Sequence, residues 1–282
     1  MSAVSSPKRT IEFSPGQPTV LIGERINPTG RQKLAESLAR GNFGVLLSEA
    51  QRQVEAGADI LDVNVTIPSG DEPALLREAV LQLVEKVGIP LCLDSANPAA
   101  LEAALAVYPG RALVNSVTGE AHSLEAVLPL VKRHRAVVVG LPLDEHGIPG
   151  DPGLRLVIAR RILEAAVQQG LSTEDVIIDC LATAAAVDPR AGAIALETVR
   201  LVSQELRANT LLGVSNVSFG LPGRAAINAC FLGQAIAAGL TCAIADPTDP
   251  SVVQTIAAAD LLAGRDEYAR RYLAHYRRTR PR

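Results

Sequence analysis

Eight short runs of aliphatic and β-branched residues alternate along the chain with longer segments whose apolar residues have helical spacing. The short runs lie at residues 19–22, 60–65, 89–94, 112–115, 136–141, 176–179, 210–215 and 241–246. The helical segments lie at residues 31–40 with 46–56, then at 72–87, 99–107, 124–133, 154–169, 191–206, 225–238 and 252–262. Runs that are apolar at successive positions are typical of a parallel sheet covered by helices. Eight such units predict an α/β fold, a single (β/α)8 TIM barrel.

No linker-like stretch divides these units, so the barrel is expected to form one domain over residues 19–264. The alternative, a doubly wound sheet, lacks its Gly-x-Gly-x-x-Gly turn after a strand. Residues 1–18 are expected to form a flexible N-terminal arm, and residues 265–282 an Arg- and Tyr-rich C-terminal helix and tail. Tyr268, Tyr272 and Tyr276 stand four residues apart, so they would share one helix face that packs on the barrel or on the second subunit of a homodimer.

The composition argues against several classes of protein. The net charge is -3, and aromatic residues make up 3% of the chain with no Trp, which argues against nucleic-acid binding. No apolar stretch approaches the roughly 20 residues that span a bilayer, and no apolar segment follows Lys8 and Arg9 to make a secretory signal. The four cysteines have no Cys-x-x-Cys spacing and the four histidines no His-x-x-x-His pair, so no bound metal is expected. We expect buried free thiols in a reducing, cytoplasmic compartment.

Polar side chains end most of the predicted strands. They are Glu24-Arg25-Ile26-Asn27, Asp62-Val-Asn64, Asp94-Ser-Ala-Asn97, Asn115-Ser116, Asp179, Ser215-Asn216 and Asp246. In a (β/α)8 barrel this end of the strands carries the active site. Carboxylates and carboxamides suit a planar heterocycle rich in N–H groups, because they meet its edge with paired hydrogen bonds. Taken singly, Asn97 and Asp246 each precede a proline and also look like helix N-caps.

The same strand ends carry a family resemblance that extends over residues 21–262. The matching blocks are Gly23-Glu-Arg-Ile-Asn27, Asp62-Val-Asn-Val65, Leu91-Cys-Leu-Asp-Ser-Ala-Asn97, Val114-Asn-Ser116, Gly147-Ile-Pro149, Ile178-Asp179, Gly213-Val-Ser-Asn-Val-Ser-Phe-Gly220 and Ala243-Ile-Ala-Asp246. With these blocks the chain resembles the pterin-binding methyltransferases. The family includes methyltetrahydrofolate:corrinoid/iron–sulfur protein methyltransferase and the folate-binding module of cobalamin-dependent methionine synthase. Its members are (β/α)8 barrels, in agreement with the strand count.

The resemblance implies a set of site residues. Asn216 matches the asparagine that contacts the methyl-bearing N5 nitrogen, and we expect it to be catalytic. The expected pterin-binding residues are Asp94, Asn97, Asn115, Asp179, Gly213, Ser215, Phe219 and Arg224. Among these, Asp94, Asn115 and Asp179 match the residues that hydrogen-bond the ring. With so few aromatic residues in the chain, recognition is expected to rest on these polar edge contacts rather than on stacking.

The activity that the resemblance implies is methyl transfer between 5-methyltetrahydrofolate and the Co(I) form of a corrinoid, in either direction. Tetrahydrofolate is then a substrate, and the corrinoid is carried by a partner, either a corrinoid/iron–sulfur protein or the corrinoid protein of an O-demethylase system. An N5-methyl amine is a poor leaving group, so cleavage needs positive charge at N5 in the transition state. The Asn216 amide can donate a hydrogen bond there, whereas no dedicated acid is evident from the sequence.

The chain departs from the family pattern at two places. Cys180 follows Asp179 where relatives often have Pro, and the loop after the fifth strand reads Leu141-Pro-Leu-Asp-Glu-His-Gly-Ile-Pro149 where relatives commonly have Thr-Met-Asn before their Gly-Ile-Pro. In that loop Asp144-x-His146 superficially resembles the corrinoid-ligating Asp-x-His-x-x-Gly motif, but Pro149 breaks the match. The corrinoid is therefore expected on a separate protein. One alternative is a dihydropteroate synthase-like enzyme, although Asn27-Pro-Thr-Gly30 and Asp246-Pro-Thr-Asp249 stand where its signature loops would be. The other alternative is a non-catalytic folate-binding protein or a scaffold for a corrinoid protein.

Overall fold

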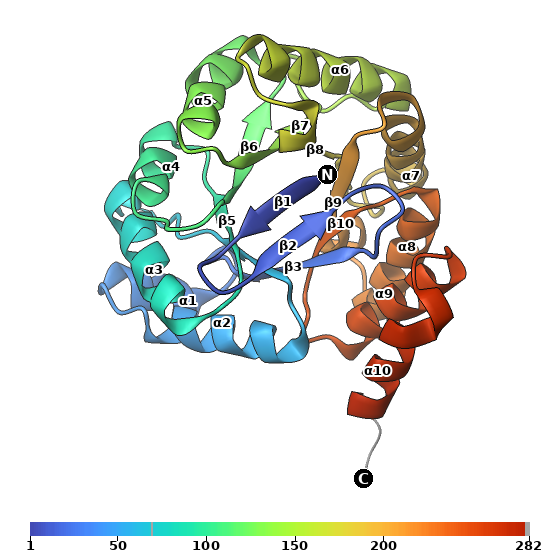
Figure 1. The fold of residues 1–282 in the computed structure, drawn as a ribbon, viewed down its shortest axis with the longest axis horizontal. Coiled ribbons are helices and arrows are strands. Elements are labelled where there is room, and N and C mark those ends of the chain that lie inside the picture. The colour runs from blue at the N-terminus through green and yellow to red at the C-terminus, as the bar shows by residue number, and fades with distance from the viewer. Residues whose placement is uncertain (69, 280–282) are drawn as a thin grey trace.

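A computed structural model describes residues 1–68 and 70–279, so positions 280–282 of the expected C-terminal tail lie outside the described residues. Eight parallel strands close into a barrel in the order β10-β3-β4-β5-β6-β7-β8-β9. The strands are β3 (Val20–Ile26), β4 (Ile60–Val63), β5 (Leu91–Asp94), β6 (Leu113–Thr118), β7 (Val137–Leu141), β8 (Val176–Asp179), β9 (Asn209–Gly213) and β10 (Cys242–Ala245). Figure 1 shows the helices as a ring around the strands. The predicted (β/α)8 barrel is confirmed.

Helices follow the barrel strands along the chain and cover the outside of the barrel. They are α1 (Gln32–Ala39), α2 (Gly44–Ala56), α3 (Glu72–Lys86), α4 (Pro98–Leu105), α5 (Ala121–Arg133), α6 (Pro152–Gln168), α7 (Ala191–Leu201), α8 (Arg224–Ala238) and α9 (Pro250–Leu262). Short 3-10 turns η1 (Thr173–Asp175) and η3 (Val214–Ser218) and a π-helical turn η2 (Val202–Leu206) lie between them. The predicted strands and helices are therefore all present, with ends that shift by a few residues.

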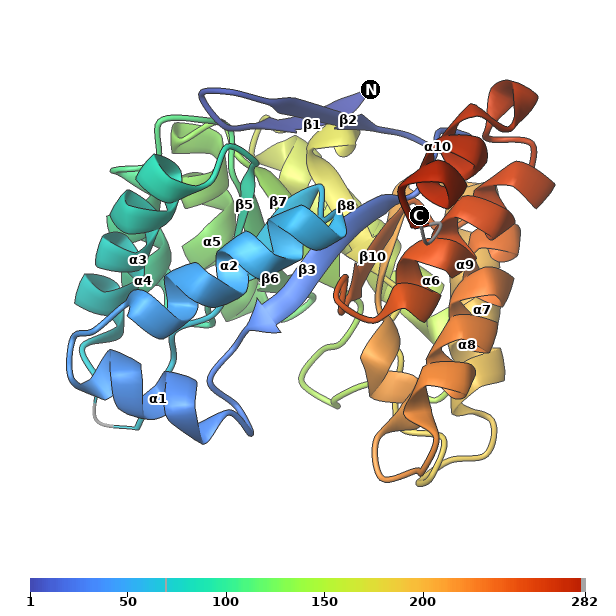
Figure 2. The same ribbon diagram turned by 90° about the horizontal axis from the view of Figure 1, so that it is seen from below.

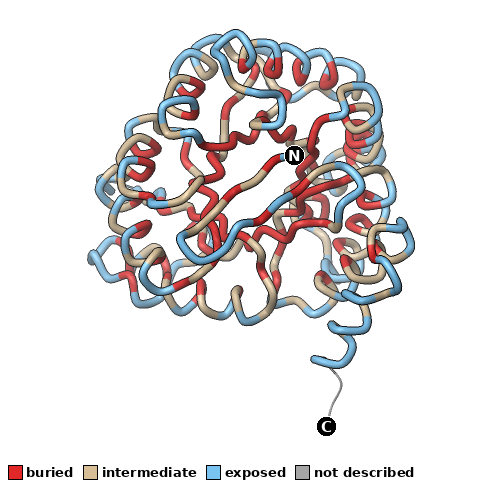
Figure 3. Tube along the Cα trace, viewed as in Figure 1, coloured by how far each residue is buried: buried red, intermediate tan, exposed pale blue. Residues whose placement is uncertain are grey.

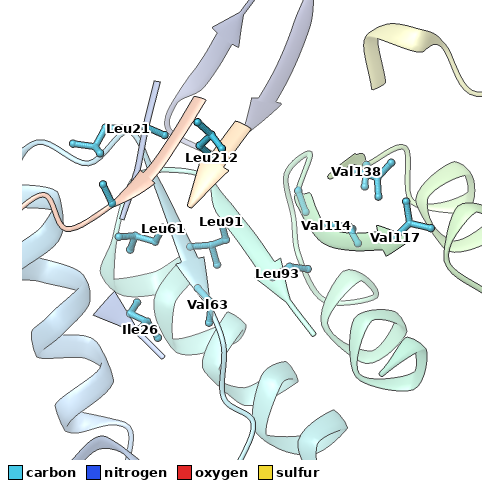
Figure 4. Packing of buried hydrophobic residues seen from close by; sticks show 14 of the residues in the cluster. Leu21, Ile26, Leu61, Val63, Leu91, Leu93, Val114, Val117, Val138 and Leu212 are labelled. Atoms are coloured by element: carbon cyan, nitrogen blue, oxygen red, sulfur yellow. The ribbon is translucent and has the colours of Figure 1, made fainter. Parts of the chain in front are cut away.

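Strand alternation produces two apolar layers, because successive side chains point to opposite faces of a strand. Leu21 points outward to the helices, whereas Val20 and Ile22 point into the barrel. Figure 4 shows the outward layer on neighbouring strands, and Figure 3 shows that burial is concentrated on the strands and the inner helix faces. The residues inside the barrel are Val20, Ile22, Ile60, Cys92, Leu113, Val137, Val139, Ile177, Leu211 and Cys242. This inner layer fills the barrel with aliphatic side chains and two thiols.

The N-terminal segment is ordered, so the expected flexible arm is wrong. Strands β1 (Ser2–Ser5) and β2 (Thr10–Phe13) form an antiparallel hairpin. It lies across the end of the barrel where the strands begin (Figures 1 and 2). Val4, Ile11 and Phe13 are buried and join the inner apolar layer. The hairpin closes this end of the barrel because the alternating pattern of Thr10-Ile-Glu-Phe13 gives β2 one apolar face.

The C-terminal helix is present, but it starts later than the tyrosine spacing predicted. Helix α10 (Arg270–Thr279) follows a 3-10 turn η4 (Glu267–Ala269) and packs against α9. The Asp266 carboxylate accepts hydrogen bonds from the backbone N–H groups of Arg271 and Tyr272, at 3.0 and 2.9 Å, which fixes the helix start. Tyr268 has a left-handed backbone (φ +56°) before the helix and is 83% exposed. The expected stripe of three tyrosines on one helix face is therefore wrong.

Two of the strand-end residues were also interpreted as helix caps. Asn97 is the N-cap of α4, and its side chain accepts a hydrogen bond from the Ala99 N–H at 3.0 Å. Asp246 is not a cap, because α9 begins later and Asp249 caps it. The Asp246 carboxylate instead accepts hydrogen bonds from the backbone and hydroxyl of Thr248, at 2.9 and 2.6 Å. None of the helices described, over residues 1–68 and 70–279, is long and apolar enough to cross a membrane.

Candidate active site

A ring of polar side chains forms where the inner apolar layer ends. On each strand, the inward position after the last apolar one of that layer lies at the C-terminal mouth of the barrel, at the lower side of Figure 2. These positions hold six polar residues, Glu24, Asp62, Asp94, Asn115, Asp179 and Asp246, and two that are not polar, Leu141 and Gly213. Asp246 follows Ile244, which is partly buried against the inner layer. Four of them were predicted as site residues, Asp94, Asn115, Asp179 and Gly213. The shared register of the barrel brings them to one end of the molecule.

Asp94 and Asn115 are direct neighbours on the adjacent strands β5 and β6, and each is hydrogen-bonded to a residue of the β4 end. The amide of Asn64 donates to Asp94 Oδ2 at 3.0 Å, and the amide of Asn115 donates to Asp62 Oδ1 at 3.3 Å. Burial raises the pKa of Asp94 to about 6 against the opposing effect of the Asn64 hydrogen bond. Above pH 7 the Asp94 carboxylate is therefore mostly ionised and can accept hydrogen bonds from N–H groups.

Asp62 lies below this pair and was not among the predicted site residues. Complete burial raises its pKa well above the ordinary value, and the charge of Asp94 adds to the effect. The Cys92 thiol and the Asn115 amide both hydrogen-bond to it. Because Asp62 supports Asn115 from beneath, it positions a predicted pterin-binding residue. The strand-end pattern contained Asp62 and Asn64, but their pairing with Asn115 and Asp94 depends on the strand register.

Asp179 occupies the opposite side of the mouth, at the end of β8. Its Oδ1 accepts the backbone N–H of Leu181 at 2.8 Å, and burial raises its pKa to about 6. The buried Arg155 of α6 fixes the following loop by donating to the carbonyls of Cys180 and Leu181, at 2.8 and 2.7 Å. Its Nε also donates to the carbonyl of Pro149 at 2.8 Å. Cys180, which replaces the usual proline, is buried in this clamp, and the clamp defines the shape of the wall beside Asp179.

Asn216 reaches the mouth from η3, directly after β9. A Cβ atom built on Gly213 would lie 3.0 Å from Asn216 Nδ2, so the amide lies over the inward face of that glycine. The amide makes no hydrogen bond to any residue of the described chain, which leaves its N–H groups available to a ligand. Ser215 next to it donates to Glu24 Oε1 at 2.7 Å, from one side of β10 to the other. The segment 213–216 therefore places a glycine, a hydroxyl and a carboxamide side by side at the edge of the mouth formed by β9.

The remaining predicted residues make mostly local contacts. Arg224 at the start of α8 donates to the Ser218 hydroxyl and to the Ser215 carbonyl, both at 2.8 Å, and lies 4.9 Å from the centroid of the Phe219 ring. These contacts stabilise η3. Phe219 is 50% exposed, and the Arg224 guanidinium lies over its ring. Asn97 is occupied as the cap of α4, which favours the capping interpretation of that residue over pterin binding.

Charged residues that the prediction left out surround the Glu24 edge. Arg25 donates from Nε to Glu49 at 2.9 Å and from Nη1 to Asp246 at 2.5 Å, which joins β3, α2 and β10. Arg31 is partly buried nearby, and burial together with the charge of Arg25 lowers its pKa. No group of three or more potential metal ligands occurs within residues 1–68 and 70–279. The polar groups of the site are thus carboxylates, carboxamides, a hydroxyl and, at the Glu24 edge, guanidinium groups.

Comparison with known proteins agrees with this geometry. The sequence pattern of the family described as pterin binding enzyme matches residues 23–246, and the chain belongs to that family. It is similar to the methylcorrinoid:tetrahydrofolate methyltransferase of Eubacterium limosum, with 28% identity over 270 residues that cover 92% of this chain and 96% of the relative. It is also similar to the methionine synthase of Mycobacterium tuberculosis, with 31% identity over 255 residues, 86% of this chain but 21% of that much longer protein.

Solved structures with the same fold include dihydropteroate synthases. The enzyme of Xanthomonas albilineans in complex with 7,8-dihydropteroate superposes with a TM-score of 0.69 at 19% identity, covering 93% of this chain and 98% of that one. The enzyme of Yersinia pestis with a sulfonamide drug complex reaches a TM-score of 0.72 at 15% identity. At these identities the likeness shows a shared barrel. The family predicted from the strand-end blocks is confirmed, and the chain is an enzyme of the pterin-binding family.

Proposed function

We propose that this protein is a methyltransferase that moves the N5-methyl group between methyltetrahydrofolate and the cobalt of a corrinoid held by a separate protein. The observation that carries the proposal is the Asn216 amide, which lies over Gly213 at the mouth with its N–H groups uncommitted to residues of the described chain. It belongs to a pterin-binding barrel that resembles the Eubacterium limosum methylcorrinoid:tetrahydrofolate methyltransferase over 92% of its length.

The ring supplies what a pterin requires. The carboxylates of Asp94 and Asp179 accept hydrogen bonds from the N–H groups of the pterin, and the Asn115 carboxamide offers both a donor and an acceptor. In this arrangement Asn216 donates to N5 as the methyl group departs, which stabilises the electron pair that stays on nitrogen. The corrinoid supplies the Co(I) nucleophile, or the methyl group in the reverse direction.

A partner protein is needed because the corrinoid is expected to come from outside this chain. The loops around the mouth expose the apolar side chains of Ile148, Val187 and Phe219, which are 47, 86 and 50% exposed. These side chains would give a docking corrinoid protein apolar surface next to the site. We further propose the homodimer expected from the sequence, which sedimentation velocity would test by giving twice the 29.6 kDa mass of one chain.

The central test is methyl transfer with purified protein. Incubation of 5-methyltetrahydrofolate with cob(I)alamin, and of methylcobalamin with tetrahydrofolate, is followed by the absorbance of the corrinoid. Asn216→Ala should lower the transfer rate about 100-fold, as loss of a transition-state donor does, and weaken folate binding about tenfold. Gly213→Ala should have a smaller effect of the same kind, because its Cβ displaces the amide without removing it.

Controls separate this proposal from the alternatives. Gln17→Ala removes an exposed carboxamide next to the N-terminal hairpin, and it should leave both measurements unchanged. Tight folate binding without methyl transfer in either direction would favour a folate-binding protein or scaffold. Formation of 7,8-dihydropteroate from a dihydropterin substrate and 4-aminobenzoate would favour a dihydropteroate synthase. Transfer that survives intact in Asn216→Ala would contradict the role of that amide.

A further inference from the structure

Glu24 is a carboxyl group at the mouth that lies beside the segment 213–216 that holds Asn216. Strand β10 separates β3 from β9, and its register places Glu24, Asp246 and Ser215 at the same level on adjacent parts of the barrel. Across β10, Glu24 Oε1 accepts a hydrogen bond from the Ser215 hydroxyl at 2.7 Å. Ser215 immediately precedes Asn216. One hydrogen bond therefore joins a carboxyl to the hydroxyl of the residue that is adjacent in sequence to the proposed N5 contact.

The surroundings of Glu24 favour retention of a proton. Burial raises its pKa, the Ser215 hydrogen bond opposes this, and the charge of Asp246 raises it further. Arg31 from the start of α1 and Arg224 from the start of α8 act in the opposite direction, and neither forms an ion pair with Glu24 among the described residues. Asp62 on β4 faces the same carboxyl. The net direction is upward, so Glu24 holds its proton at a higher pH than a free glutamate does.

Other candidate acids are less well placed. Asp94 and Asp179 occupy the positions proposed for the pterin edges, where an ionised acceptor is needed. The thiols of Cys92 and Cys180 are buried, and burial raises the pKa of both well above the ordinary value. His146, on the loop after β7, lines a groove of about 340 Å³ against α6 with Leu154 and Arg161. Glu24 is thus the acid that is hydrogen-bonded to Ser215, the residue that precedes Asn216.

We propose that Glu24 stores the proton that N5 takes up, and that the Ser215 hydroxyl relays it. The inference rests on the proposed methyl transfer. Co(I) donates its electron pair to the methyl carbon, the bond from carbon to N5 breaks, and that bond's electron pair remains on N5. As that bond breaks, Ser215 donates its hydroxyl proton to N5 and takes one from protonated Glu24, so that Glu24 becomes the donor of the hydrogen bond that it accepts in the free protein. Glu24 is left as a carboxylate and tetrahydrofolate with an N5–H. In the reverse direction the same path carries the proton from N5 to Glu24.

The test compares pH profiles of methyl transfer in single turnovers with free cob(I)alamin and with methylcobalamin. Glu24→Gln should lower the transfer rate at least about 100-fold, the usual effect of removing a proton donor. It should also abolish the part of the pH profile of the rate that reports a group with a pKa above that of an ordinary glutamate. Glu24→Asp should restore part of the rate and of the pH dependence. Ser215→Ala should fall between wild type and Glu24→Gln, because water replaces the hydroxyl inefficiently.

Folate affinity, measured by calorimetry, identifies folding failures and distinguishes this role from a structural one. It should change less than about threefold in Glu24→Gln, because Glu24 delivers a proton and does not anchor the ring. Glu12→Gln on β2, an exposed carboxylate at the opposite end of the barrel, is the matched control. Wild-type rates and pH profile in Glu24→Gln and Ser215→Ala would overturn the relay while leaving the methyl transfer intact. Absence of transfer by the wild-type protein in both directions would overturn the proposed function, and the relay with it.

Discussion

Replacement of Asp179 by asparagine is expected to make the protein more stable and, at the same time, worse at binding folate. Asp179 ends β8 at the mouth, and its burial raises the pKa to about 6 from an ordinary value of 3.8. The folded state therefore disfavours the carboxylate that the unfolded chain holds without penalty. Asparagine keeps the shape and can still accept the hydrogen bond from the Leu181 N–H at 2.8 Å. It removes only the buried charge.

The size of the effect follows from linkage between protonation and folding. A pKa of about 6 in the folded state and 3.8 in the unfolded state corresponds to about 3 kcal/mol of lost stability at pH 8. This penalty is absent below pH 3.8, grows as pH rises toward 6 and is constant above it, so at pH 5 about half remains. Relative to wild type, Asp179→Asn should gain about 2–3 kcal/mol in the free energy of unfolding at pH 8 and about half of that at pH 5.

Urea unfolding followed by far-ultraviolet circular dichroism measures these differences, since a chain without Trp gives little fluorescence signal. Asp246→Asn is the control of opposite sign. Burial raises the Asp246 pKa, but hydrogen bonds from Thr248 and Arg25 outweigh burial and the net pKa is lowered. Its carboxylate stabilises the fold at neutral pH, so Asp246→Asn should destabilise the protein at pH 8. An Asp179→Asn variant that is less stable than wild type at pH 8, or whose gain does not shrink at pH 5, would refute the reasoning.

Further predictions concern the two ends of the barrel and the loop clamp. Phe13→Ala should cost about 3–4 kcal/mol of stability, because Phe13 at the end of β2 is buried as part of the inner apolar layer. Folate affinity measured on the folded protein should stay unchanged. Phe219→Ala removes a phenylalanine side chain that is half exposed, so it should change stability by less than about 1 kcal/mol and weaken folate binding. Equal losses of stability in Phe13→Ala and Phe219→Ala would contradict the assignment of Phe13 to the barrel interior. Arg155→Met leaves three carbonyl groups without their donor and should cost about 2–4 kcal/mol, with faster hydrogen exchange in the loop after β8; unchanged exchange would show that the loop does not depend on the clamp.

The barrel could be predicted because its signal repeats. Each strand has a short apolar run, each helix has its own spacing, and eight repeats leave few alternatives. The N-terminal hairpin was missed because its two strands are only four residues long and their apolar residues alternate with polar ones. They therefore lack the continuous apolar run and the following helix that mark the barrel strands. The tyrosine stripe failed for a local reason, since the Asp266 carboxylate caps a helix that starts at Arg270. Short elements and helix starts depend on single contacts that periodicity does not contain.

The site shows the same division between pattern and contact. The pattern of polar strand ends placed Asp94, Asn115 and Asp179 at the mouth, and it placed Glu24 there too, although Glu24 was not among the predicted site residues. The pairing of Glu24 with Ser215 joins residues that are 191 positions apart in sequence. It depends on closure of the barrel by β10 between β9 and β3, which no local segment specifies.

These contacts imply that stability and binding respond to pH in opposite directions. The contribution of Asp94 and Asp179 to the stability of the free protein falls as pH rises toward 6, because burial opposes their ionisation. Folate binding should strengthen over the same interval, because the ionised carboxylates are the acceptors that pterin N–H groups require. Bound folate stabilises the folded state by an amount that grows with its affinity, about 2.7 kcal/mol when the ligand is at one hundred times its Kd. The stability of the folate-saturated protein should therefore depend less on pH than that of the free protein. In Asp179→Asn the pH dependences of the free and the folate-saturated protein should be more alike, because one of the two titrating carboxyls is gone.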